Sequence, residues 1–131
     1  REGAELKRRR TEGPPVQAGQ ARLDVLKSGT WVETHLLAVD KDRWVLGRSA
    51  DQVDMAMNHA SISRHHAMII RQNGELLLAD LGSTHGTAVA GQRLEKNKLV
   101  PLTDGVSISF GASTRTFVFR DGQGGVADTS P

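Results

Sequence analysis

The amino-acid sequence predicts an all-β fold, a sandwich of two antiparallel sheets with functional loops gathered at one end. Its apolar residues occur in short runs of four to seven residues, and Gly, Asn, Asp or Ser separates one run from the next. Apolar and polar residues alternate within several runs, as in residues 106–110. No window of about a dozen residues keeps a helical period, and the nearest, residues 52–60, is brief. Many short strands of this kind are typical of a β-sandwich.

The strands are expected where these runs fall. The clearest local signal is the pair Asn73-Gly74, which can adopt the positive φ angles of a two-residue hairpin turn. We therefore expect Met68 to Gln72 and Glu75 to Asp80 to pair antiparallel. In chain order the apolar runs lie at 23–29, 34–39, 43–47, 66–72, 75–81, 106–111 and 115–120.

The length of 131 residues, of which 37% are hydrophobic, predicts one domain with a core of its own. Residues 1–21 combine charge, Gly and Pro with very few apolar residues, so we expect a flexible basic leader there. The folded domain is expected over residues 22–121. Residues 122–131 return to Gly and small polar residues and are expected to form a flexible tail.

Composition excludes several classes of protein. Without cysteine the chain has neither disulfides nor thiolate metal sites. No apolar run approaches the roughly 18 residues of a membrane span, so we expect no membrane contact. Residues 1–10 hold five Lys or Arg against two Glu, whereas the rest holds twelve against thirteen Asp or Glu. The basic run Lys7 to Arg10 could be a nuclear import signal or a weak nucleic-acid contact, but the remainder lacks the excess of positive charge that duplex binding requires.

Enzyme and metal-site interpretations are weak. Ser63, His65 or His66, and Asp80 supply the residue types of a hydrolase triad, but such types occur together by chance in most domains. Adjacent His65 and His66 would point to opposite faces of a strand, and no carboxylate stands at metal-ligand spacing beside them or beside His59. The sequence therefore predicts no catalytic residue, no metal site and no cofactor.

Three polar loops instead suggest a cradle for an anion. Arg48 follows Gly47 at the end of a predicted strand, and residues 61–67 supply two hydroxyls, a guanidinium and two imidazoles. The hydroxyls of Ser83 and Thr84 lie in a turn between two glycines. A phosphate dianion accepts hydrogen bonds from such groups.

Four ordered motifs, LGRS (46–49), SISRHHA (61–67), LGSTHGT (81–87) and SFGAS (109–113), resemble the forkhead-associated (FHA) domain, a phosphothreonine-binding β-sandwich. The resemblance spans about residues 23–120. The run RLEKNKLVPL followed by SFGASTR is similar to the FHA domains of nuclear regulators of type-1 protein phosphatase.

The resemblance implies a role for each site residue. Arg48, Ser63 and Thr84 would contact the phosphate, with Ser83 beside them, and Arg64 would contact the phosphate or an acidic neighbour. His85 stands where most FHA domains have Asn, so its contact to the peptide main chain is open. Structural support of the binding loops is expected from Gly47, His66, Gly82 and Gly86.

By the same resemblance the chain is a non-enzymatic module that recruits phosphothreonine-containing nuclear proteins, including phospho-Thr-Pro segments of splicing factors. Type-1 protein phosphatase would be contacted only through regions outside this chain, because a docking segment with a basic residue before an apolar pair is absent. Two alternatives stay open. One is an FHA-like scaffold with a degenerate phosphate site, and the other is a nucleic-acid tether that uses the basic leader.

Overall fold

A computed structural model describes residues 13–15 and 19–122 of the chain. These residues form strands and connecting loops, and no helix occurs among them. The expected all-β class is therefore confirmed. The strands are β1 (Ala21–Lys27), β2 (Thr30–Leu37), β3 (Arg43–Gly47), β4 (Met55–Ala56), β5 (Ala67–Gln72), β6 (Glu75–Asp80), β7 (Thr87–Val89), β8 (Gln92–Arg93), β9 (Val100–Pro101), β10 (Ser107–Phe110) and β11 (Arg115–Arg120).

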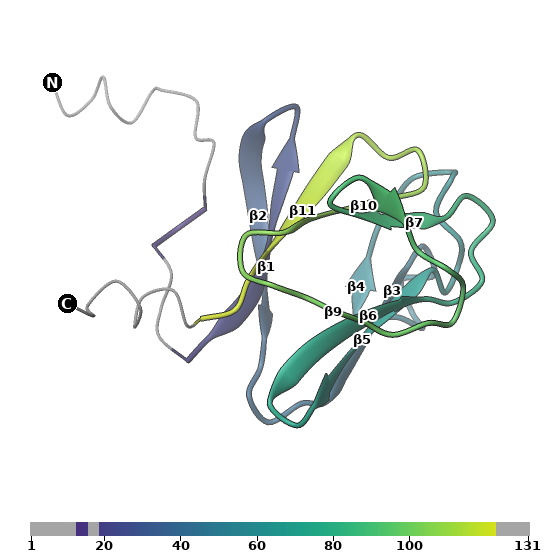
Figure 1. Ribbon diagram of the computed structural model, residues 1–131. Helices are drawn as coiled ribbons and strands as arrows, with labels where there is room; N and C mark the ends of the chain where they lie inside the picture. Colours follow the sequence, from purple (N-terminus) through teal and green to yellow (C-terminus); the bar gives the residue numbers. More distant parts are fainter. Residues whose placement is uncertain (1–12, 16–18, 123–131) are drawn as a thin grey trace, which may run out of the picture.

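Two sheets pack face to face, as Figure 1 shows. One has the order β2-β1-β11-β10-β7-β8, and the other has the order β4-β3-β5-β6-β9. The expected antiparallel pairing holds with one exception, because β4 runs parallel to β3. The short β4 lies within the segment 52–60, the nearest approach to a helical period in the sequence.

The core lies between the sheets and is built from side chains at alternate strand positions. Leu23 and Val25 of β1 are fully buried, as are Leu46 and Leu78 on the opposite sheet. Each large apolar side chain buried in this way contributes roughly 1.5–3 kcal/mol. This contribution fixes the register of the strands, because a slip by one residue would turn the apolar positions outward.

The predicted hairpin is confirmed. β5 pairs antiparallel with β6 from Ala67 opposite Asp80 to Gln72 opposite Glu75. The turn between them has φ angles of 53° at Asn73 and 79° at Gly74, the left-handed values that an Asn-Gly turn supplies at low cost. The carboxyl end of β6 thereby reaches the loop that carries Ser83 and Thr84.

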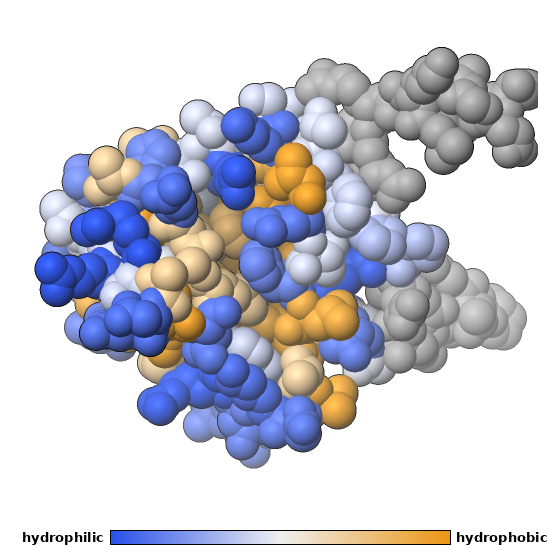
Figure 2. All heavy atoms as spheres, turned by 180° about the vertical axis from the view of Figure 1, so that it is seen from behind, coloured by the Kyte–Doolittle hydropathy of each residue, from blue (hydrophilic) through white to orange (hydrophobic). Residues whose placement is uncertain are grey.

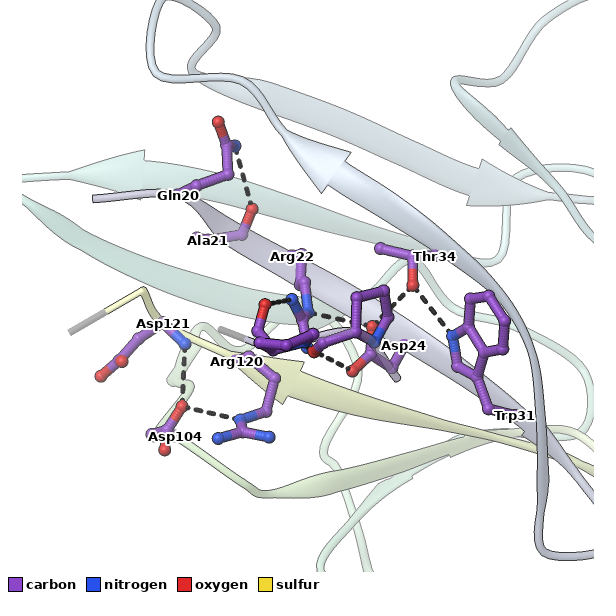
Figure 3. A network of polar contacts seen from close by, with 11 residues as sticks. Gln20, Ala21, Arg22, Asp24, Trp31, Thr34, Asp104, Arg120 and Asp121 are labelled. Atoms are coloured by element: carbon purple, nitrogen blue, oxygen red, sulfur yellow. Dashed lines mark hydrogen bonds and ion pairs between the residues drawn. The ribbon is translucent and has the colours of Figure 1, made fainter. Parts of the chain in front are cut away.

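The segment before β1 contacts the outer face of its sheet. Both Arg22 and Asp24 point outward from β1, yet they are 4% and 3% exposed. The guanidinium of Arg22 donates to the carbonyl oxygens of Pro14 and Pro15, and its Nε lies 3.0 Å from Asp24 Oδ1. Figure 3 shows this pair beside Thr34 and Trp31. Most of the expected leader, 1–12 and 16–18, and the expected tail from 123 onward lie outside the described residues, so the domain boundaries stay predictions.

The surface in Figure 2 is mainly hydrophilic, with a narrower band of apolar residues between polar ones. Large apolar side chains that stand exposed in the described part of the chain include Leu36 (61%) and Val39 (67%). Nowhere in residues 13–15 and 19–122 is there a helix that could span a bilayer.

Candidate functional site

The three polar loops singled out in the sequence meet at one end of the sandwich. They follow β3, precede β5 and follow β6, respectively. The backbone N–H of Arg48 donates to Ser63 O at 3.0 Å, and the N–H of Thr84 donates to Ser63 Oγ at 3.1 Å. Ser63 therefore joins the first loop to the third, and all three residues expected at the phosphate lie around it.

Arg48 is exposed, and its side chain is held at one point. Its Nε donates to Ile62 O at 2.9 Å, while its two Nη groups have no partner among the described residues. The two Nη groups can therefore donate together to two oxygens of one oxyanion. Gly47 lets the backbones of the first and second loops lie close together, because a Cβ there would collide with the carbonyl oxygen of Arg64.

Ser63 and Thr84 supply hydroxyls on the two loops that hydrogen bonds link to the loop of Arg48. Ser63 Oγ accepts from Thr84 N–H, so its own O–H stays available to donate. Thr84 is exposed, and its hydroxyl forms no hydrogen bond within the described residues. Arg64, on the same loop as Ser63, is exposed as well. One guanidinium and two hydroxyls are donors suited to the oxygens of a phosphate.

His66 lies between the second and third loops and contacts both. It is fully buried, and its ring packs edge-on against Phe110 with centroids 5.6 Å apart. Its Nδ1 accepts from Ser63 N–H at 3.0 Å, and its Nε2 lies 2.8 Å from Gly86 O. Since Nδ1 accepts, Nε2 carries the proton and donates to Gly86. One ring therefore sets the distance between the second and third loops.

Asp80, at the end of β6, anchors the third loop from below. Its Oδ2 accepts from the N–H groups of Gly82 and Ser83, both at 2.9 Å. Its Oδ1 accepts from the hydroxyl groups of Ser83 at 2.5 Å and Thr87 at 2.6 Å. An aspartate that bonds backbone N–H groups two and three residues ahead is a common turn-forming device.

The pKa of Asp80 is lowered. Burial acts to raise the pKa, but the hydrogen bonds from the Ser83 and Thr87 hydroxyls and from the backbone N–H groups of Ser83 and Gly82 outweigh it. The carboxyl of Asp80 beneath the third loop is therefore ionised at neutral pH. Asp80 holds the third loop in place through hydrogen bonds from the backbone N–H groups of Gly82 and Ser83.

Ser83 differs from the expectation that it contacts the phosphopeptide. It is 1% exposed, its hydroxyl donates to Asp80, and its Oγ accepts from Gly86 N–H at 2.9 Å. With its hydroxyl turned inward, Ser83 supports the loop, and only Thr84 of the two hydroxyls faces solvent. Gly82 and Gly86, with φ angles of 80° and 88°, let the chain turn on either side of it.

The geometry does not assemble the weighed hydrolase triad. His66 Nδ1 bonds the backbone N–H of Ser63 and leaves its hydroxyl unpaired with an imidazole. His66 Nε2 faces Gly86 O, with Asp80 Oδ1 farther away at 3.9 Å. Groups of three or more His, Cys, Asp or Glu side chains that could hold a metal do not occur in the part of the chain that the structure describes.

Sequence reasoning missed several supporting residues. Asp80 was weighed only as a triad member, although an aspartate two residues before Gly-Ser could have indicated a turn anchor. Ser61 was not singled out; its Oγ accepts from Ala112 N–H at 2.7 Å and lies 2.9 Å from His59 Nδ1. The hydrogen bond from Ala112 joins loops of the two different sheets, so the sequence around Ser61 carries no signal for it.

Comparisons with known proteins agree with this geometry. A family model described as the FHA domain matches residues 44–111. The chain is 39% identical over 79% of its length to a protein phosphatase 1 regulatory inhibitor subunit PPP1R8 homolog from Arabidopsis thaliana, and 37% identical over 82% to the human nuclear inhibitor of protein phosphatase 1. It covers only 28% and 32% of these two relatives.

Solved structures of similar fold include one with a bound ligand. The N-terminal FHA domain of Rad53p from S. cerevisiae, in complex with a phosphothreonine peptide, has a TM-score of 0.65 and 27% identity over 75% of this chain and 91% of that chain. The FHA domain of the CT664 protein from Chlamydia trachomatis has a TM-score of 0.68 and 28% identity over 78% and 97%, respectively.

Proposed function

The chain belongs to the FHA domain family, a family of phosphothreonine-binding modules, and we propose that it binds phosphothreonine in partner proteins through Arg48, Ser63 and Thr84. The observation that carries the proposal is the guanidinium of Arg48, whose Nε donates to Ile62 O while its two Nη groups have no partner among the described residues. The backbone N–H of the same residue donates to Ser63 O, which brings the second loop alongside. A planar fork can donate to two phosphate oxygens at once, and the hydroxyls can serve the third.

Arg64 and His85 are proposed to contact the peptide around the phosphothreonine, since both are exposed on the same loops. His66, Ser83, Gly47, Gly82 and Gly86 are proposed to hold the loops. A neutral imidazole offers one donor and one acceptor, fewer groups than an amide, so His85 can form fewer bonds to a peptide backbone than the usual Asn.

We further propose that the partners are phosphorylated nuclear proteins and that the chain is the targeting part of a regulator of phosphatase and splicing functions. The phosphatase and nuclear parts are supported by the name of the human relative. The splicing part, with proline directly after the phosphothreonine, is inherited from the family resemblance. Because the chain covers about a third of the two relatives, a phosphatase contact is assigned to regions outside it.

Calorimetric titration of one phosphothreonine-proline peptide and its unphosphorylated twin tests the proposal. A hydrogen bond to a charged group contributes roughly 1.5–3 kcal/mol, so the phosphorylated peptide should bind about a hundredfold more tightly or better. Arg48→Ala should lose most of this preference, and Arg48→Lys, which keeps the charge without the fork, should fall between. Binding should weaken below the second phosphate pKa of about 6.

Arg43→Ala is the matched control, because Arg43 is an exposed arginine at the opposite end of β3. It should leave both affinities unchanged. Equal affinity of the native chain for the two peptides would favour a degenerate scaffold. A third peptide with alanine in place of proline tests the splicing-factor preference separately, and no loss of affinity would remove that inference alone.

A further inference from the structure

A second arginine lies at the edge of the phosphate loops, on a different element. Arg93 ends β8, which pairs with β7 so that Arg93 stands opposite Ala88. A Cβ added to Gly86 would lie 2.6 Å from Nε, 2.7 Å from Cζ and 2.8 Å from Nη2 of Arg93. The guanidinium therefore packs directly on the backbone of Gly86, which has no side chain to keep it away.

The charge of Arg93 is not used within the described part of the chain. Arg22 pairs with Asp24 and Arg120 with Asp104, whereas the exposed side chains of Arg43 and Arg64 have no partner among the described residues. Arg93 is exposed, and none of the described residues forms a hydrogen bond or ion pair with its side chain. In this respect it resembles the Nη groups of Arg48 at the phosphate cradle.

A small hollow beside Arg93 continues from the loop that bears Thr84. Gly86 is two residues from Thr84, so at most about 7 Å of backbone separates them. The hollow opens to solvent next to the exposed imidazole of His85. It is lined by His85, Gly86, Thr87, Ala88, Gly91, Arg93, Ser109 and Gly111.

We propose that Arg93 and His85 form a second anion subsite, which takes a carboxylate or a phosphate carried by a residue near the phosphothreonine. This inference rests on the proposed phosphothreonine binding, because it needs a peptide already held at Arg48. A guanidinium fixed on one face by Gly86 keeps its outward edge free to donate to two oxygens. The partner class is thereby narrowed to acidic or multiply phosphorylated segments.

The alternative role for Arg93 is packing alone, with no part in recognition. In that case its replacement would affect all peptides equally or only lower the melting temperature. Arg93→Gln separates the two roles, because glutamine keeps a planar amide that can pack on Gly86 but carries no charge. Arg93→Ala removes both the packing and the charge.

The experiment measures affinities by fluorescence polarisation for a phosphothreonine peptide flanked by alanines. In two further series a single aspartate, or a single phosphoserine, is moved through the flanking positions. In the native chain an aspartate at one position should tighten binding about twofold to fivefold, as exposed ion pairs do. Phosphoserine at that position should tighten binding at least as much. If only the aspartate peptide or only the phosphoserine peptide binds more tightly, that result identifies whether the subsite takes a carboxylate or a phosphate.

Arg93→Gln should abolish this gain and leave the alanine-flanked peptide unchanged, whereas Arg48→Ala should weaken every peptide. The inference is overturned if no position gives a gain, if the gain survives in Arg93→Gln, or if the variant weakens all peptides alike. Failure of the native chain to distinguish phosphorylated from plain peptide would overturn the proposed function itself. Loss of only the aspartate gain would leave that function intact.

Discussion

The carboxylate of Asp80 accepts four hydrogen bonds beneath the third loop, from Gly82, Ser83 and Thr87. It therefore fixes the backbone that presents Thr84 and His85 while remaining 1% exposed itself. Buried charge of this kind is stable only because its lone pairs are satisfied. The positions of the proposed phosphate-binding residues therefore depend on a buried carboxylate behind their loop.

Asp80→Asn should lower the free energy of unfolding at neutral pH by about 2–3 kcal/mol, since hydrogen bonds to a charged group are lost and an amide N–H₂ faces other donors. The pKa of Asp80 is lowered on folding, so its ionisation stabilises the native state above the unfolded pKa of about 3.9, and this contribution is lost as pH falls through the folded value. Denaturant unfolding of both proteins across acidic pH measures it.

The difference in stability between native chain and variant should shrink as pH falls below about 4. The pKa values of Asp54 and Asp104 are lowered too, so the native curve alone cannot assign the effect to Asp80. Taking the difference removes their contribution, because both proteins retain these two residues. A difference that stays constant from pH 7 into acid would contradict the assigned role.

At this scale the sequence indicates candidate ligand-binding residues more directly than the residues that support their loops. Arg48, Ser63 and Thr84 stand in short motifs with chemistry that can be read directly. Ser83 was placed with them because its hydroxyl has the same chemistry, and only the fold shows that it points to Asp80. Arg93 approaches Gly86 through the pairing of β7 with β8, a contact that its own sequence neighbours do not signal.

Among the elements, the segment Gly13 to Pro15 covers the outer face of β1. The carbonyl oxygens of Pro14 and Pro15 accept hydrogen bonds from the Nη groups of Arg22, which also donates to Asp24. Asp24 Oδ1 also accepts from the hydroxyl of Thr34 on β2 at 2.7 Å. Part of the segment 1–21, expected to be a flexible leader, is therefore hydrogen-bonded to the domain, and its contribution to stability can be tested within residues 13–15.

Gly13→Ala should lower the melting temperature of the whole chain by about 4–8 °C, which corresponds to about 1 kcal/mol in a domain of this size. A Cβ at Gly13 would lie 2.5 Å from Asp24 Oδ2, and Asp24 cannot move because Arg22 and Thr34 hold it. The segment must then shift and loosen its bonds to Arg22. Thermal unfolding followed by circular dichroism gives the shift.

Gly3→Ala is the control, since it is the same substitution in the same leader. It should leave the melting temperature unchanged. If Gly13→Ala also melts like the native chain, water replaces the two proline carbonyls without cost, and the boundary expected at residue 22 is adequate for a stable domain.

A strand is easier to predict from the sequence when its pairing partner lies close to it in the chain and when it is long enough to show a period. The β5–β6 hairpin has its turn signal between its two strands, so sequence located it correctly. The strands β4 and β9, which pair with β3 and β6, have two residues each, and β9 reaches β6 only after β7 and β8 have intervened in the chain. Two residues cannot show a period, so these strands and the division into two sheets required the structure.

For the molecule as a whole, charge distribution separates phosphopeptide binding from a nucleic-acid tether. Four consecutive basic residues, Lys7 to Arg10, account for most of the positive charge near the start of the chain, and the rest is close to neutral. Binding to duplex DNA depends on many such charges and falls steeply with salt. The proposed recognition at Arg48 uses one guanidinium and two hydroxyls, so it should be independent of the basic run.

Replacing Lys7, Arg8, Arg9 and Arg10 together by Gln should therefore leave the affinity for a phosphothreonine peptide within about twofold, the effect of an exposed pair or less. Calorimetry on the whole variant chain measures this, and Arg48→Ala serves as the opposite case, with the basic run intact and the phosphate contact removed. A parallel electrophoretic shift assay with duplex DNA detects the tether. The nucleic-acid tether would explain the chain better if the native chain shifts DNA, the quadruple variant does not, and neither protein binds the phosphopeptide. The positive charge responsible for binding would then lie in residues 7–10 and not at Arg48.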